Sequence, residues 1–155
     1  MNSTKFFSVA VLVLVLSATC DATNYENCPG KTLTSKINKI TVTPCPAEPC
    51  KLVKGTNVTV AVDFTMNSDQ MAKTATTRVH GVIGDVRVPY ETKYTDACKT
   101  AGLKCPLNPS SHNVYQAKLY ISKVFPDIDL YVEWELVDQD QKDIFCFQIP
   151  VEIGG

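Results

Sequence analysis

The chain has 155 residues, a net charge of −1 at pH 7, 45% hydrophobic residues and 9 prolines. This composition is typical of one globular domain and excludes a disordered, repetitive or fibrous chain. The near-neutral charge excludes a nucleic-acid-binding protein that depends on a basic surface, so we expect no nucleic-acid partner.

Residues 1–22 have the layout of a secretory signal peptide. One lysine precedes an apolar stretch that ends at Leu16, and small residues follow it. The stretch is too short to span a bilayer. Cleavage after Ala22 removes one lysine and one aspartate and leaves the net charge at −1; cleavage after Cys20 is the alternative. We therefore expect an exported protein whose mature domain comprises residues 23–155.

Segments rich in Thr, Val, Ile and aromatic residues lie between turn signals, which predicts β-strands. None of them has a helical period, and the prolines sit at segment edges, where a missing N–H group does least harm. In chain order the segments are residues 39–43, 57–65, 75–88, 114–124, 130–137 and 143–153. Together they predict an all-β fold, an antiparallel β-sandwich of about seven strands.

The segment that begins at Asn57 alternates strictly between apolar and more polar residues. Its apolar face comprises every second residue from Val58 to Phe64, so Asn57 points outward. The letters "NVT" at 57–59 form an N-glycosylation sequon, and an outward asparagine can carry a glycan without disturbing the core. We expect glycosylation at Asn57; a chance occurrence of so short a motif is the alternative.

The segment 130–137 also alternates, and its bulky apolar face includes Trp134 and Leu136. Such a face is ordinarily filled by the core of the domain, but it can instead line a cavity for a ligand. Glu133 and Glu135 are expected on the opposite, exposed face, which does not suit a catalytic acid and base.

Other candidates for chemistry are weak. Ser110 and His112 are close in sequence, but neighbours in a loop do not converge into a catalytic site by spacing alone. His80 lies within a predicted strand and is expected to be structural. The carboxylates of 138–143 lack the glycine and glutamate positions of a calcium-binding loop, so a solvated hairpin turn is expected. We therefore expect no enzyme, catalytic residue, cofactor or metal.

Removal of Cys20 with the signal peptide leaves six cysteines, an even number typical of a disulfide framework in an exported protein. Six cysteines allow 15 pairings. Close spacing favours two local bridges, which leaves one long-range bridge. The favoured pairs are Cys45 with Cys50, Cys98 with Cys105, and Cys28 with Cys146.

Several motifs occur in the order and spacing of the ML lipid-recognition family, which the mature chain resembles over essentially its whole length. These motifs are "TPCPAEPCKLVKG", "VHG", "VPY", "CKTAGLKCP", "FP", "VEWELVDQD" and "FCFQIPVEI". The resemblance implies an immunoglobulin-like sandwich whose splayed sheets enclose a hydrophobic tunnel. It also implies the disulfide pairing that spacing favours.

The resemblance further implies the positions of ligand-binding residues in that tunnel. Tyr90, Ile121 and Phe125 match entrance positions. The deeper wall is expected to comprise Val42, Phe64, Tyr115, Leu119, Trp134 and Phe147.

Lys123 shares strand parity with Ile121 and Phe125, just before Pro126. If that parity holds, its stem lies along the apolar entrance while its ammonium group stays near water. Such a cation would favour a ligand carboxylate and shift preference from sterols toward fatty acids. The alternative is a solvated lysine at a point where the parity has broken.

By resemblance we expect a lipid carrier, secreted or in the lysosome lumen, that binds a sterol or a long-chain fatty acid. It would be a monomer that touches membranes transiently and delivers its ligand to a membrane acceptor protein. The alternative is an accessory for lipid recognition in chemosensory or innate immune signalling.

Overall fold

The structure, a computed structural model, describes residues 22–67 and 69–155. The signal peptide expected at 1–22 therefore lies outside the described residues, apart from its last position. The described residues form nine strands and one short helix. The strands are β1 (Glu26–Asn27), β2 (Ser35–Thr43), β3 (Cys50–Val53), β4 (Asn57–Met66), β5 (Thr76–Ile83), β6 (Val86–Tyr90), β7 (His112–Tyr120), β8 (Ile128–Val137) and β9 (Asp143–Gly154); the helix is α1 (Ala97–Thr100).

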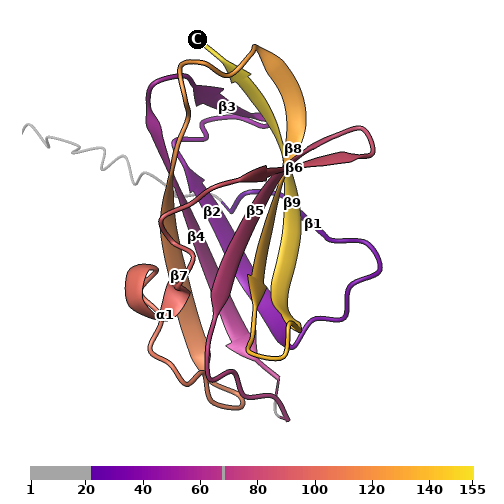
Figure 1. Cartoon of the computed structure of the whole chain (residues 1–155), viewed down its shortest axis with the longest axis vertical. Helices are drawn as coiled ribbons and strands as arrows, with labels where there is room; N and C mark the ends of the chain where they lie inside the picture. The colour runs from indigo at the N-terminus through magenta and orange to yellow at the C-terminus, as the bar shows by residue number, and fades with distance from the viewer. Residues whose placement is uncertain (1–21, 68) are drawn as a thin grey trace, which may run out of the picture.

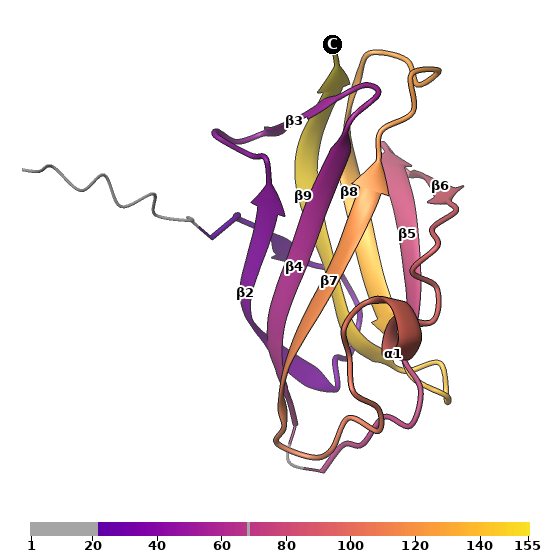
Figure 2. The same cartoon turned by 90° about the vertical axis from the view of Figure 1, so that its left-hand side faces the viewer.

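Two sheets pack face to face, as Figures 1 and 2 show, and this confirms the predicted sandwich. One sheet has the order β2-β4-β7. The other has the order β1-β9-β8-β5-β6, and β3 also pairs with β9. The pairing of β3 with β9 is parallel, with Cys50 opposite Val151. The sandwich is therefore not wholly antiparallel, because the chain enters β3 from the edge of the other sheet.

The short elements β1, β3 and α1 are absent from the sequence prediction. Each spans four residues or fewer. That length is too short to display a strand or helix period. The helix α1 lies beside the lower end of β5 in Figure 2, and the N–H of its Ala97 donates to the carbonyl of Ala75.

Alternation along β4 sets the inner face of the three-stranded sheet. The alternate residues from Val58 to Phe64 are buried, as their spacing predicts. In the register of the sheet, Val60 lies between Val42 of β2 and Ala117 of β7. This row of small and branched side chains faces the other sheet.

The three expected disulfides are present. Cys28–Cys146 attaches the residue after β1 to the first half of β9, Cys45–Cys50 closes the turn before β3, and Cys98–Cys105 joins α1 to the loop that follows it. No helix in the described part of the chain is long and apolar enough to cross a membrane.

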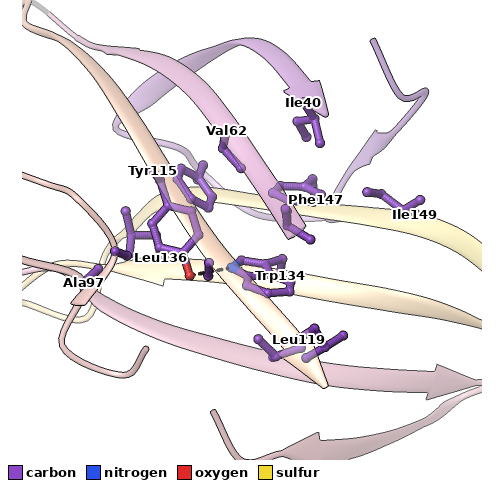
Figure 3. Close-up of a cluster of buried hydrophobic side chains, with 14 of the residues drawn as sticks. Ile40, Val62, Ala97, Tyr115, Leu119, Trp134, Leu136, Phe147 and Ile149 are labelled. Atoms are coloured by element: carbon purple, nitrogen blue, oxygen red, sulfur yellow. Dashed lines mark hydrogen bonds between the residues drawn. The ribbon is translucent and has the colours of Figure 1, made fainter. Parts of the chain in front are cut away.

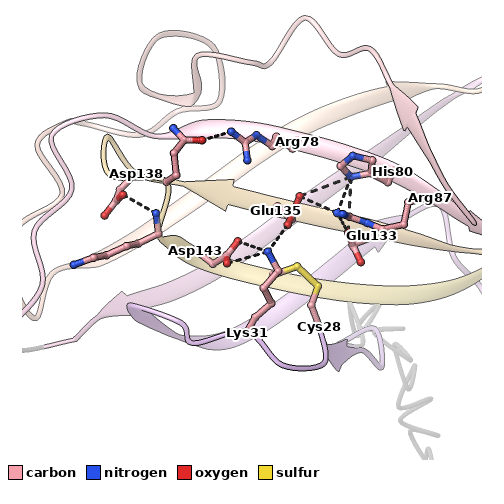
Figure 4. A network of polar contacts seen from close by, with 12 residues as sticks. Cys28, Lys31, Arg78, His80, Arg87, Glu133, Glu135, Asp138 and Asp143 are labelled. Atoms are coloured by element: carbon pink, nitrogen blue, oxygen red, sulfur yellow. Dashed lines mark hydrogen bonds and ion pairs between the residues drawn. A yellow bond between two sulfur atoms is a disulfide. The ribbon is translucent and has the colours of Figure 1, made fainter. Parts of the chain in front are cut away.

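Glu133 and Glu135 lie on the outer face of β8, but the prediction that they are exposed is wrong. They are only 5% and 3% exposed. Lys31 Nζ lies 3.0 Å from Glu135 Oε1, and Arg87 donates to both glutamates (Figure 4). Alternation predicts which face of a strand a residue occupies. Whether that face is exposed to water depends on long side chains from distant segments, which alternation does not reveal.

The carboxylates of Glu133 and Glu135 also shift the pKa values of Arg87 and Lys31. Burial alone would lower the pKa of Arg87, but hydrogen bonds and charge attraction from Glu133 and Glu135 raise it overall. The hydrogen bond to Glu135 raises the pKa of Lys31. His80 lies beside the same carboxylates, with Nδ1 3.7 Å from Glu135 Oε2. This network fastens β6 and the Lys31 loop to β8.

Candidate ligand-binding site

An apolar pocket of about 230 Å³ opens between the sheets. Strands β3, β5, β6, β8 and β9 of the larger sheet supply most of its walls. Leu119 of β7 and the connection 121–127 supply the opposite side. Tyr90 and His80 are the polar side-chain types among its lining residues, so the space suits an apolar molecule.

The three residues expected at the entrance are brought together, with Tyr90 and Phe125 partly exposed and Ile121 only 1% exposed. Tyr90, Ile121 and Phe125 all line the pocket. The rings of Tyr90 and Phe125 pack edge to face with their centres 6.3 Å apart. The Tyr90 hydroxyl donates to the carbonyl of Tyr120 across 2.9 Å, and partial burial raises the pKa of Tyr90. This hydrogen bond joins β6 of one sheet to β7 of the other. We call this open side of the pocket, beside Tyr90 and Phe125, the mouth.

A second, smaller space of about 20 Å³ lies deeper between the sheets. Val42, Leu119, Trp134 and Phe147, all expected in the deeper wall, line it. Figure 3 shows Leu119, Trp134 and Phe147 converging on the interior from β7, β8 and β9. In place of one continuous tunnel, the described residues therefore enclose an open pocket and a separate inner cavity.

Phe64 and Tyr115 line neither space. Both are fully buried and pack edge to face on Phe145, at ring-centre distances of 5.2 and 5.7 Å. Here the apolar side chains of the two sheets pack against one another and leave no space for a ligand. The structure thus places these two residues in the packed end of the sandwich rather than on a ligand surface.

Polar groups at this packed end satisfy one another. The Trp134 indole N–H donates to the Tyr115 hydroxyl across 3.1 Å, and Thr77 Oγ1 lies 3.0 Å from the same hydroxyl (Figure 3). Burial raises the pKa of Tyr115 to about 12. Because the hydroxyl is already engaged by two partners, the packed end offers little to a polar ligand group.

Lys123 lies outside the pocket lining. Strand β7 ends at Tyr120, so the parity that would align Lys123 with Ile121 is lost. The Lys123 stem instead crosses Gly55, where a Cβ atom would come within 2.7 Å of Lys123 Cε. Gly55 also has φ of +80°, a conformation that glycine adopts readily. This placement favours the solvated-lysine alternative.

The other polar motifs do not assemble into a catalytic site in the described residues. His112 Nε2 lies 2.7 Å from Asp63 Oδ1, whereas the Ser111 hydroxyl donates to the carbonyl of Asn108. Asp138 Oδ1 accepts the N–H groups of Asp140 and Lys142, which gives that segment the hairpin turn expected of it.

Sequence reasoning missed part of the pocket wall. Leu52 and Ile153 both line the pocket and lie opposite each other where β3 pairs with β9. Val132 also lines it, and its place on the apolar face of β8 was the available signal. Leu52 had no such signal, because β3 is only four residues long.

A β-sandwich with an apolar pocket between its sheets defines a class of small lipid-binding modules. The chain belongs to the ML domain family, whose model matches residues 22–153.

Relatives of known name cover almost the whole chain. NPC intracellular cholesterol transporter 2 of Bos taurus is 35% identical, over 96% of this chain and 98% of its own. The ecdysteroid-regulated 16 kDa protein of Manduca sexta is 36% identical, over 95% of this chain and 98% of its own. The crystal structure of a Niemann-Pick type C2 protein from Japanese carpenter ant superposes with a TM-score of 0.76 and 27% identity, covering 84% of this chain and 99% of that one.

Proposed function

We propose that the protein is an exported carrier that binds a sterol or a long-chain fatty acid between its sheets and passes it to an acceptor. The observation that carries this proposal is the apolar pocket that opens beside Tyr90, Ile121 and Phe125. A relative named as a cholesterol transporter, similar over almost the entire chain, supports a sterol among the ligands.

The mechanism is transfer of apolar surface from water into the pocket, and it has no covalent step. Each buried CH₂ group contributes about 0.8 kcal/mol, and the lost freedom of the bound molecule offsets part of the sum. The pocket of about 230 Å³ is smaller than the roughly 300–1,000 Å³ typical of ligand sites. Binding therefore requires the sheets to separate around the ligand.

Exposed aliphatic residues surround the mouth and suit a brief contact with a membrane or an acceptor protein. Val86 and Val88 on β6 are 62% and 48% exposed, and Val124 in the connection after β7 is 87% exposed. Contact through this rim would let the ligand pass without crossing water. The signal-peptide pattern of residues 1–22 supports export, with delivery outside the cell or in the lysosome lumen as the proposed destination.

Asn57 is proposed as the glycan attachment site. It is exposed at the start of β4, on the outer face of the three-stranded sheet. We expect a mature mass above that of the unmodified chain when the protein is made by a eukaryotic secretory pathway. A mass equal to the unmodified mature chain with three disulfides would reject the assignment.

A displacement assay tests the proposed function directly. Cholesterol and oleate should displace a fluorescent sterol or fatty-acid probe from the parent protein at one probe per chain. Ile121→Ala and Phe125→Ala should weaken both ligands at least several-fold, because each removes apolar wall from the pocket. Val124→Ala is the matched control, since Val124 lies between them in sequence but does not line the pocket.

Equal affinities in all four proteins would show that the ligand does not bind in this pocket. A parent protein that binds neither ligand would overturn the carrier proposal itself. Native mass spectrometry of protein from its natural source would then identify whichever lipid it does carry.

A further inference from the structure

The pocket and the inner cavity share three lining residues, Leu52, Leu119 and Val132. These side chains come from β3, β7 and β8 and so from both sheets. Residues such as Phe125 line only the pocket, whereas residues such as Trp134 line only the inner cavity. The shared residues therefore stand between the two spaces.

We propose that Leu52, Leu119 and Val132 form a partition that sets how deep a ligand reaches, and hence which lengths of apolar chain the protein retains. This inference rests on the proposed lipid-carrier function and adds the residues that determine ligand length. A ligand short enough for the pocket binds with the partition closed. A longer ligand has to displace the partition to reach the cavity beside Trp134.

The three side chains differ in how readily they move. Val132 is β-branched and lies on β8, which pairs with strands on both sides, opposite Gly81 and Ile149. Leu119 lies near the end of β7, at the edge of the three-stranded sheet. Leu52 lies on β3, a four-residue strand attached to β9. The two leucines are thus the movable part of the partition, and Val132 is its fixed part.

The volumes explain why the partition discriminates by length. The inner cavity of about 20 Å³ is too small to receive a chain until neighbouring side chains move. Within the pocket, each added methylene should tighten binding about fourfold. Beyond the partition, each further methylene displaces packed side chains, so the gain per methylene should fall. A plot of log affinity against chain length should therefore show a break.

The position of that break is the measurement that tests the partition. Dissociation constants are measured by calorimetry for a homologous series of straight-chain fatty acids, from medium to long chain, with cholesterol as a bulky comparison. Leu119→Ala and Leu52→Ala should move the break to longer chains, because they join the two spaces. Leu119→Phe should move it to shorter chains and weaken cholesterol most.

Leu130→Ala is the matched control, because Leu130 lines the pocket but not the inner cavity. It should weaken all chain lengths by a similar factor and leave the break in place. Circular dichroism establishes which variants fold, and Leu119→Phe and Leu52→Ala test the partition from opposite directions if Leu119→Ala does not fold.

The outcomes separate the inference from the proposed function. Tight binding with a break that stays at one chain length in every partition variant overturns the partition and leaves the carrier intact. A break that Leu130→Ala moves as far as Leu119→Ala overturns it as well. A parent protein that binds neither the fatty acids nor cholesterol overturns both.

Discussion

The two ends of the sandwich are built from the same alternating strands but are filled differently. At the mouth, Leu130 and Val132 of β8 remain partly exposed, and one hydrogen bond from Tyr90 to Tyr120 joins the sheets. At the packed end, Phe145 and its aromatic neighbours fill the space completely. The packed end holds the two sheets together, and we propose that the sheets separate around a ligand at the mouth.

The two ends should differ most in how much stability is lost when one phenylalanine at each end is replaced by alanine. Phe145→Ala should lower the free energy of unfolding by about 3–5 kcal/mol, because it leaves a cavity in a fully packed aromatic cluster. Phe125→Ala should cost only about 1 kcal/mol, since its ring is partly exposed at the mouth. Urea unfolding measures both, and equal losses would erase the distinction between the ends.

The next effect is alkaline destabilisation through Tyr115. Burial raises its folded-state pKa from 10.0 to about 12, so the folded protein holds this proton more tightly than the unfolded chain. The resulting stability is complete below pH 10 and is lost as pH rises through about 12, a loss of about 3 kcal/mol.

The comparison with Tyr115→Phe isolates this proton. Groups that titrate in both proteins cancel in the difference, so the parent should lose its advantage over the variant between pH 10 and 12. A stability difference that stays constant across that range would show that Tyr115 is not buried as described.

A smaller effect distinguishes the hydroxyl groups of the two ends near neutral pH. Tyr115→Phe should cost about 1–3 kcal/mol, because the buried Trp134 indole N–H loses its acceptor. Tyr90→Phe should cost less than about 1 kcal/mol, because water can reach the Tyr120 carbonyl at the mouth. In Tyr90→Phe, amide hydrogen exchange should be faster only in β6 and β7, the strands that this hydrogen bond joins. Faster exchange throughout the sandwich would contradict a local joint.

The smallest expected effect is that of Lys123→Ser. Lys123 crosses Gly55 and does not line the pocket, so its removal should change oleate and cholesterol affinities by less than about 0.5 kcal/mol each. A loss confined to oleate would instead place the ammonium group at the ligand carboxylate.

The sequence predicts the packed end of the sandwich better than it predicts the mouth. Alternation along β4 correctly assigned every second residue from Val58 to Phe64 to the inner face. Alternation treats Phe64 and Leu119 alike, however, although one fills the core and the other lines the pocket. That difference depends on the spacing of the opposite sheet, which no local pattern contains.

Contacts between distant segments account for the remaining differences. The burial of Glu133 and Glu135 depends on Arg87 and Lys31, which reach them from β6 and from the loop after β1. The position of Lys123 depends on where β7 ends. The sequence did not reveal that end, because apolar residues continue to alternate beyond it. Resemblance, rather than periodicity, predicted that Tyr90, Ile121 and Phe125 lie together, and all three line the pocket.

A long ligand that enters at the mouth should displace the partition and extend between the sheets to the inner cavity. Trp134 borders that cavity and is the chain's single tryptophan, so its fluorescence reports on one place. Titration with cholesterol or oleate should shift its emission and saturate at one ligand per chain. The half-maximal shift should occur at the concentration at which a displacement assay shows half-occupancy. An unchanged emission spectrum at full occupancy would contradict the claim, because the ligand would then be bound without reaching the interior.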